Sequence, residues 1–429
     1  MTLLIQNGTV INPQGQSGRL DILIAGGRIA EIAARIDCPQ GCTVVDAVGK
    51  HVFPGFVDMH THLREPGQEF KETIATGTRA AAAGGFTTVA CMPNTKPVVD
   101  NEALVKFILD KAATEGAVRV LPIAAITKGS QGKELTEMGF LLEAGAVAFS
   151  DDGRPVENPR TMELALRYAK NFNALLISHC EDKALAEGGA MNEGTVATRL
   201  GLPGISATAE SLMVSREILL AEELHTMVHI AHVSTAASVE LIRQAKVRGV
   251  RVSAETCPHY FAATDELVEG YGTATKVNPP LRTEADRQAI IAGLRDGTID
   301  AIATDHAPHH IDDKDVEYPL AAFGISGLET AFALAISYLV QPGLLTLEEL
   351  SRKLSTVPAS LLGIDGGVLQ EGARADLCVA DLDAKWTVDA KRFLSKGHNT
   401  PFHGWELTGR VTDTISAGKL VYNHGNSVV

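Results

Sequence analysis

The segment Phe53-Pro-Gly-Phe-Val-Asp-Met-His-Thr-His62 is an apolar run that ends in a His-x-His pair. Side chains two residues apart on a strand point to the same face, with Cα atoms about 6.5 to 7 Å apart, so both imidazoles can reach one metal ion. An isolated His-x-His pair is a weak motif, because two histidines on a strand often meet by packing alone. The metal-site hypothesis therefore depends on what ends the other apolar runs of the chain.

After residue 50, short apolar or β-branched runs alternate with Ala-, Leu- and Glu-rich stretches that are typical of helices. This alternation predicts an α/β fold. Eight such runs match the strand number of a (β/α)8 TIM-type barrel. The runs cover residues 53–59, 87–92, 118–125, 146–150, 175–178, 228–233, 250–255 and 299–304.

In a barrel of this kind the chemistry lies at the carboxyl ends of the strands. Imidazole and carboxylate groups stand at the ends of five of the eight runs, and together they are the donors that a two-metal hydrolytic centre needs. These candidate ligands are His60 and His62 (first run), Asp152 (fourth), His179 (fifth), His232 (sixth) and Asp305 (eighth).

Local pattern decides between neighbouring candidates in one case and leaves the other open. His229 and His232 are an odd number of residues apart, so they face opposite sides of a strand. His232 lies nearer the carboxyl end and is the candidate ligand, whereas His229 is interpreted as structural. Asp151 and Asp152 also face opposite ways, and the local pattern does not say which one points inward.

Asp305 has the strongest local context, because a carboxylate at the end of an apolar strand is costly to bury unless it is paired or metal-bound. Two divalent cations balanced by two carboxylates and a hydroxide leave a site charge of about +1, which would suit an anionic substrate. Zinc fits this donor set, and manganese or cobalt would also accept it.

Composition excludes several classes of protein. The chain has 429 residues, 45% of them hydrophobic, and a net charge of −14, which argues against nucleic-acid binding as a main task. No apolar run is long enough to span a membrane and the first residues lack a basic signal region, so we expect a cytoplasmic protein. Cys38 and Cys42 resemble half a zinc site, but no second pair follows, and a structural role is favoured.

The two ends of the chain differ from the middle. Residues 2–12, 21–32, 43–46, 376–381 and 410–422 form short alternating patterns broken by Asn-Gly and Gly-Gly turns. We expect a small β-sandwich built from residues 1–51 and 365–429, flanking a barrel over residues 52–364.

Nine motifs identify a family, and they run in order along essentially the whole chain. The chain closely resembles class I (long-chain) bacterial dihydroorotases of the amidohydrolase superfamily. His-x-His is common to that superfamily, whereas Leu-Arg-Glu-Pro-Gly and Asn94 narrow the resemblance to this branch. The motifs are Phe-Val-Asp-Met-His-Thr-His-Leu-Arg-Glu-Pro-Gly (56–67), Cys-Met-Pro-Asn-Thr (91–95), Phe-Ser-Asp-Asp-Gly (149–153), Ser-His-Cys-Glu (178–181), Ala-His-Val-Ser (231–234), Glu-Thr-Cys-Pro-His-Tyr (255–260), Val-Asn-Pro-Pro-Leu-Arg (277–282), Ala-Thr-Asp-His-Ala-Pro-His (303–309) and Phe-Gly-Ile-Ser-Gly (323–327).

The resemblance implies a reversible reaction, the cyclisation of N-carbamoyl-L-aspartate to (S)-dihydroorotate in pyrimidine biosynthesis, through a zinc-bridged hydroxide. It also implies a role for each matching residue. His60, His62 and Asp305 would hold one zinc, His179 and His232 the second, and Asp152 would bridge them, with Asp305 also the general acid/base. The substrate-binding positions would be His62, Arg64, Asn94, Asn278 and His309, with the backbone of Phe323 and Gly324.

Alternatives to this interpretation remain. Dihydropyrimidinases, hydantoinases and allantoinases share the resemblance but use a carboxylated lysine as the bridge, and the fourth run here has no lysine. A non-catalytic scaffold for aspartate transcarbamoylase would have lost metal ligands, whereas all six are present. Residues 306–320 are expected to form either a lid or an ordinary solvated connection. The expected assembly is a homodimer, and the sequence leaves open a complex with the transcarbamoylase.

Overall fold

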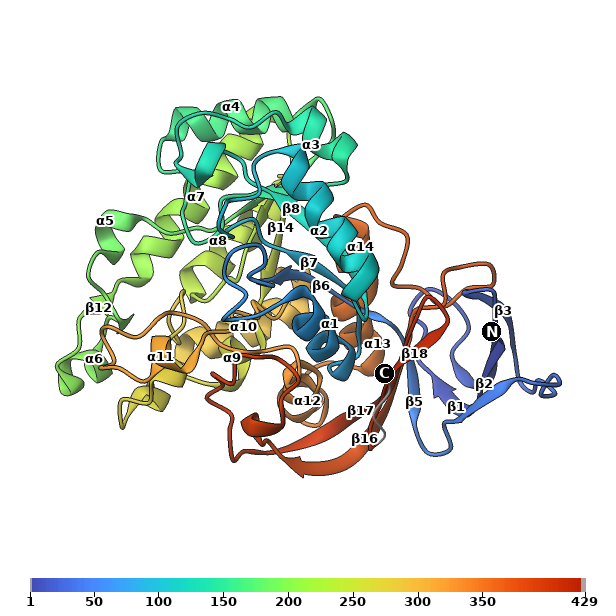
Figure 1. Cartoon of the computed structure of the whole chain (residues 1–429). Coiled ribbons are helices and arrows are strands. Elements are labelled where there is room, and N and C mark those ends of the chain that lie inside the picture. Colours follow the sequence, from blue (N-terminus) through green and yellow to red (C-terminus); the bar gives the residue numbers. More distant parts are fainter. Residues whose placement is uncertain (1, 426–429) are drawn as a thin grey trace.

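The eight predicted runs form one parallel sheet in the computed structural model, which describes residues 2–425 (Figure 1). The sheet closes on itself, since Thr61 pairs with His306 and the His62 N–H donates to the His306 carbonyl at 2.8 Å. The predicted barrel is therefore confirmed. In sheet order its strands are β6 (Phe56–Thr61), β7 (Phe86–Cys91), β8 (Arg119–Ala124), β9 (Ala148–Ser150), β10 (Leu175–Ser178), β13 (Val228–Ile230), β14 (Val252–Thr256) and β15 (Ala301–Ile302).

The barrel strands are buried on both faces, as expected for parallel strands covered by helices. Alternate residues serve different layers: Val57 and Met59 pack with Ile123 in the barrel core, while Phe56 joins the larger cluster between strands and helices. Because both faces are apolar, a polar residue inside such a strand needs a specific partner.

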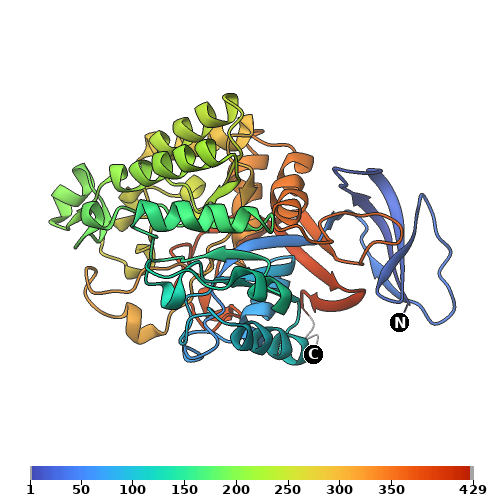
Figure 2. The same cartoon turned by 90° about the horizontal axis from the view of Figure 1, so that it is seen from above.

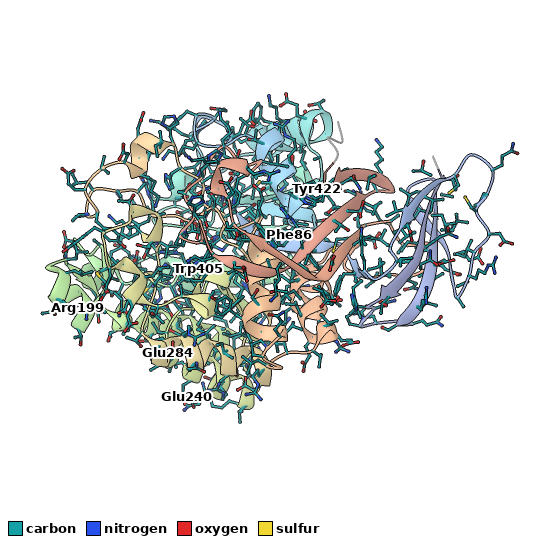
Figure 3. The ribbon with its side chains drawn as sticks, turned by 90° about the horizontal axis from the view of Figure 1, so that it is seen from below. Phe86, Arg199, Glu240, Glu284, Trp405 and Tyr422 are labelled. Atoms are coloured by element: carbon teal, nitrogen blue, oxygen red, sulfur yellow. The ribbon has the colours of Figure 1, made fainter. Side chains whose placement is uncertain are left out.

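Helices surround the barrel, and Figure 3 shows Glu240 and Glu284 on the outer surface of two of them. Local signals set their ends: α10 begins with a capping box between Thr283 and Asp286 and ends at Gly297, whose φ is 80°. The helices are α1 (Ile74–Ala83), α2 (Glu102–Glu115), α3 (Met138–Ala144), α4 (Pro159–Lys170), α5 (Lys183–Ala186), α6 (Thr195–Leu200), α7 (Ala207–Leu224), α8 (Ala236–Val247), α9 (Pro258–Ala262), α10 (Glu284–Asp296), α11 (Ile311–Lys314), α12 (Ala331–Ala335), α13 (Leu347–Ser351) and α14 (Val357–Leu361).

Strands from both ends of the chain form a second sheet beside the barrel, where we expected a β-sandwich (Figures 1 and 2). Hydrogen bonds link seven of its eight strands in the order β18-β17-β16-β5-β1-β2-β3, and the eighth, β4, pairs with β1. They are β1 (Thr2–Val10), β2 (Gly18–Ala25), β3 (Arg28–Ala33), β4 (Thr43–Asp46), β5 (His51–Pro54), β16 (Leu377–Thr387), β17 (Glu406–Ser416) and β18 (Lys419–Asn423).

The chain passes from this terminal sheet into the barrel at Gly55. Strand β5 pairs with β1 and β16, so His51–Pro54 belongs to the terminal sheet although our expected boundary lay after residue 51. A side chain at residue 55 would collide with Thr87 of β7, which explains the glycine. The run predicted as one strand over residues 53–59 is thus divided between two sheets.

Residues 306–320, where we expected a lid or an open connection, contain α11 and are anchored to the barrel. The Lys314 ammonium is buried and donates to the carbonyls of Thr273, Lys276 and Ala322 at 2.6 to 3.1 Å. Three donors therefore meet three acceptors, which matches the capacity of an ammonium group. Within residues 2–425 no helix combines the length and the apolar character needed to cross a membrane.

Candidate active site

The six candidate ligands converge at the carboxyl end of the barrel. Each exposes at most 5% of its surface. His60 lies within β6, and the other five come one to three residues after a strand: His62 after β6, Asp152 after β9, His179 after β10, His232 after β13 and Asp305 after β15. The prediction that these distant residues share one site thus agrees with their positions in the fold.

The ring and carboxylate atoms meet in two overlapping groups. His62 Nε2 lies 3.0 Å from Asp305 Oδ1, and His60 Nε2 lies 3.5 Å from the same oxygen. Asp152 Oδ1 lies 3.3 Å from His60 Nε2 and 3.6 Å from His232 Nε2. The donors of His60, His62 and Asp305 fall within 4.8 Å of one another, as do those of His60, Asp152 and His232.

His179 completes the second group from its far side. Its Nδ1 lies 2.8 Å from His232 Nε2 and 3.7 Å from Asp152 Oδ1. The second oxygen of Asp152 lies 3.5 Å from His62 Nε2, so this one carboxylate faces histidines of both groups. Asp152 therefore stands where a bridging ligand would stand.

The choice between Asp151 and Asp152, which sequence pattern left open, is decided by their contacts. Asp151 turns away from the histidines: its carboxylate accepts from the Thr127 N–H at 3.0 Å and from the Thr127 hydroxyl. Burial raises the pKa of Asp151 to about 6 despite these bonds. Asp151 therefore fixes the loop after β9, and Asp152 faces the site.

Strained backbone positions three of the site residues. Arg64, His232 and Asp305 have φ of 62°, 36° and 45°, in the left-handed region that residues with a side chain rarely adopt. Such conformations cost about 1–3 kcal/mol each and persist where the surroundings impose them. Asp58 is one residue that imposes this backbone. Its carboxylate accepts hydrogen bonds from the His60 and Thr304 N–H groups at 3.2 and 3.1 Å and so connects β6 to the segment before Asp305.

The buried polar atoms of this cluster match a metal centre. His60 Nε2 and Asp152 Oδ1 are fully buried and have no hydrogen-bond partner within residues 2–425. Unsatisfied buried polar atoms are costly, and a coordinated cation is one way to satisfy them. Burial raises the pKa of Asp305, but His60 and His62 outweigh it and hold that pKa at about 2, so the carboxylate is ionised and able to ligate.

A cavity of about 190 Å³ opens beside the cluster, a size suited to a small molecule. Polar side chains dominate its wall, and among them the buried Asn278 Oδ1 has no hydrogen-bond partner within the described residues. The lining residues are His62, Arg64, Asn94, Asp152, Gly153, His179, His232, Asn278, Asp305, Ala307, Phe323 and Gly324.

Arg64 supplies the positive charge of this cavity. Its Nε donates to the Pro308 carbonyl at 3.2 Å, and one terminal nitrogen lies 3.3 Å from His309 Nε2. The other terminal nitrogen has no hydrogen-bond partner among residues 2–425. Burial lowers the pKa of Arg64 to about 10, which still leaves the guanidinium charged at neutral pH.

The other predicted substrate-binding groups differ in how many of their hydrogen-bonding atoms are already bonded within the protein. His309 does not line the cavity; its Nε2 lies 2.8 Å from the Phe323 carbonyl, behind Arg64. Asn94 lines the cavity but also bonds His62 Nδ1 at 2.9 Å and Asp152. The Gly324 N–H donates to the Lys276 carbonyl at 2.9 Å, so it is already used.

Sequence reasoning missed two glutamates that contact candidate ligands. Glu255 Oε1 lies 2.7 Å from His60 Nδ1, and Glu181 Oε2 lies 3.5 Å from His179 Nε2. Both stand inside motifs that were noted only as family markers. The available signal was their position, since each lies in or after a barrel strand at the end that carries the site.

Solved structures of similar fold identify the class. The L-hydantoinase (dihydropyrimidinase) of Arthrobacter aurescens superposes with a TM-score of 0.90 at 27% identity, covering 100% of this chain and 97% of that one. The D-hydantoinase (dihydropyrimidinase) of Thermus sp. gives a TM-score of 0.84 at 26% identity, covering 99% and 96%. The barrel and its buried histidine–aspartate cluster thus place the chain among the amidohydrolases that act on cyclic amides.

Sequence comparison narrows the class to one family. A family model described as "Dihydro-orotase-like" matches residues 49–238. A dihydroorotase of Acetivibrio thermocellus is 54% identical over 420 residues, covering 98% of each chain, and one of Pelotomaculum thermopropionicum is 57% identical over 422 residues, again covering 98% of each. The chain belongs to the dihydroorotase family.

Proposed function

We propose that this chain catalyses the reversible cyclisation of N-carbamoyl-L-aspartate to (S)-dihydroorotate and water, a step of pyrimidine biosynthesis. One observation carries the proposal beyond family membership: a buried arginine with a free donor lines a small cavity beside an aspartate-bridged histidine cluster. A substrate with a carboxylate next to a cyclic amide would match this combination of groups.

Two divalent ions, with zinc as the expected metal, would be held by the six buried donors. His60, His62 and Asp305 would hold one ion, His179 and His232 the other, and Asp152 would contact both. When bound, the ions supply a hydroxide nucleophile near neutral pH and polarise the carbonyl that it attacks. The two unsatisfied buried atoms, His60 Nε2 and Asp152 Oδ1, support this assignment.

Asp305 is proposed as the proton carrier of the reaction. In the hydrolytic direction its carboxylate takes the nucleophile's proton and delivers it to the ring nitrogen as the C–N bond breaks. In the biosynthetic direction the same carboxylate takes the proton from the attacking ureido nitrogen and delivers it to the oxygen that leaves as hydroxide when the C–O bond breaks.

Arg64 and Asn278 are proposed to orient the substrate. The free terminal N–H groups of Arg64 face the cavity and would donate to the substrate carboxylate, while Asn278 Oδ1 would accept from a ring N–H. Asn94, held by His62 and Asp152, would act from the same wall. His309 would lie beside Arg64 and hold the Phe323 carbonyl through its Nε2–H, with Phe323 and Gly324 closing the cavity.

Relative rates on three cyclic amides test this proposal. The metal-loaded chain should hydrolyse dihydroorotate at least about 100-fold faster, in kcat/KM, than hydantoin or allantoin, because only dihydroorotate offers a carboxylate to Arg64. A preference for hydantoin or allantoin would contradict the proposal in favour of the related amidohydrolases. Absence of activity on all three, with metal bound, would favour a scaffold.

The assembly is a separate expectation. We expect a homodimer in solution, which sedimentation measurements of the purified chain would test. Adding aspartate transcarbamoylase in the same experiment tests for the larger complex.

A further inference from the structure

Glu255 makes the tightest contact of any carboxylate with the candidate ligands. It is the fourth residue of β14, exposes none of its surface, and places Oε1 2.7 Å from His60 Nδ1. The opposite ring nitrogen, His60 Nε2, points at Asp152 and Asp305. The imidazole of His60 is therefore held between a carboxylate on one side and the proposed metal site on the other.

We propose that Glu255 is a positioning residue that fixes the tautomer and the ring orientation of His60 for metal binding. The inference rests on the proposed function, because it assigns His60 to the metal centre. Glu255 would not touch the metal or the substrate; it would act only through His60.

The tautomer follows from donor and acceptor chemistry. An ionised carboxylate can only accept hydrogen bonds, so a contact of 2.7 Å requires a proton on His60 Nδ1. In a neutral imidazole the lone pair then lies on Nε2, the atom that faces the site and has no hydrogen-bond partner within residues 2–425. Glu255 thus directs the lone pair of His60 to the place where a metal would lie.

The second oxygen of Glu255 faces His229 on the opposite side. This atom, Oε2, lies 3.3 Å from His229 Nε2, and His229 Nδ1 lies 2.8 Å from the Ser253 hydroxyl. His229, Ser253 and Glu255 are each at least 97% buried. The hydrogen bond from His60 to Oε1 and the nearby His229 imidazole reduce the cost of burying the carboxylate, although Oε2 and His229 Nε2 have no hydrogen-bond partner within residues 2–425. His229, interpreted from the sequence only as structural, therefore lies beside the carboxylate that contacts His60.

The other candidate ligands are held less firmly on their outer nitrogens. Glu181 lies 3.5 Å from His179 Nε2, at the limit of a hydrogen bond, and it is partly exposed. Asn94 is a neutral amide on His62. We therefore expect loss of the Glu255 carboxylate to weaken metal binding more than loss of the Glu181 carboxylate.

The test compares Glu255→Gln with Asp21→Asn in the full chain. Asp21 is a matched control, because it is a buried carboxylate in the terminal sheet that accepts from the N–H groups of Asn7 and Ile36. Zinc affinity is measured by competition with a chelator. The visible spectrum is recorded on the cobalt-loaded protein. Thermal unfolding is followed with and without chelator. Glu255→Gln should lower zinc affinity about 10- to 100-fold and shift the cobalt spectrum, and Asp21→Asn should do neither.

Outcomes that overturn this inference can be distinguished from those that overturn the proposed function. Zinc affinity of Glu255→Gln within about twofold of the wild type, with an unchanged cobalt spectrum, overturns it while leaving the proposed function intact. The inference is also overturned if Glu255→Gln lowers the stability of the chelator-treated protein but leaves the zinc affinity of the folded chain unchanged. A wild type that binds neither zinc nor cobalt overturns both. Should Glu255→Gln not fold, Glu255→Asp, which is one methylene too short to reach His60, is measured in the same way.

Discussion

Replacing Arg64 by methionine should weaken substrate binding far more than it slows the chemical step. Arg64 is buried in the cavity wall; one terminal nitrogen has no hydrogen-bond partner among residues 2–425, and the other lies 3.3 Å from His309 Nε2, which donates to the Phe323 carbonyl. Its Nε is already occupied by the Pro308 carbonyl, so the end of the guanidinium is what remains for a ligand. Methionine keeps the volume of the stem and removes every donor.

The expected loss follows from the two donors that face the cavity. A hydrogen bond to a charged group contributes about 1.5–3 kcal/mol, so losing two costs at least about 3 kcal/mol. That corresponds to about a 150-fold fall in kcat/KM, carried mainly by KM. Arg64→Lys keeps the charge but not the planar fork, and it should lose about tenfold.

The kcat and KM of the Arg64 variants are measured by steady-state hydrolysis of dihydroorotate at equal metal content. Lys71→Met is a matched control, because Lys71 Nζ lies 3.2 Å from His309 Nδ1, on the side of that ring away from Arg64, and does not line the cavity. It should change KM by less than about threefold. An Arg64→Met enzyme with wild-type KM and a reduced kcat would refute the assignment of Arg64 to the substrate carboxylate.

Four further predictions concern the candidate metal ligands. Asp305→Ala should abolish turnover while retaining most substrate affinity, as measured by rate and by equilibrium binding of carbamoyl-aspartate; loss of binding without loss of kcat would contradict it. Asp152→Asn should reduce bound metal measured by elemental analysis, whereas Asp151→Asn should leave it unchanged and lower the melting temperature, because Asp151 bonds only the Thr127 loop. Burial lowers the pKa of His60, but Asp152 and Asp305 raise it well above 6.5, so zinc binding at pH 7 should release about one proton from this ring. Titration calorimetry in two buffers of different ionisation enthalpy measures that release. Protonated His60 therefore stabilises the metal-free fold fully below pH 6.5, and this stabilisation is lost as pH rises through the raised pKa, so chelator-treated protein should melt at lower temperature at alkaline pH.

The barrel was predictable because its signal is periodic and local. Each of the eight apolar runs became a strand, since strands buried on both faces must be apolar throughout. The boundary of the first run was wrong in one respect: residues 53 and 54 pair with the terminal sheet. An apolar residue gives the same sequence pattern in the barrel and in the terminal sheet. Only the strands that pair with residues 53 and 54, which come from the other end of the chain, distinguish the two sheets.

The candidate site was predictable to the extent that strand ends mark it. Position along the strands identified six distant candidate ligands. It did not separate Asp151 from Asp152, because Asp151 is distinguished by its bond to the hydroxyl of Thr127, which lies on another loop. Glu255 was missed for the same reason. Its partner His60 lies 195 residues away, and no local spacing reveals a contact made across the barrel.

Metal dependence of dihydroorotate turnover tests the central claim most directly. The chain is stripped with chelator, titrated with zinc, and assayed for dihydroorotate hydrolysis while bound zinc per chain is measured. Activity should be lost in the stripped chain and return in proportion to zinc, reaching its maximum near two ions per chain. A stripped chain that retains full activity, or a zinc-loaded chain that does not hydrolyse dihydroorotate, would contradict the account.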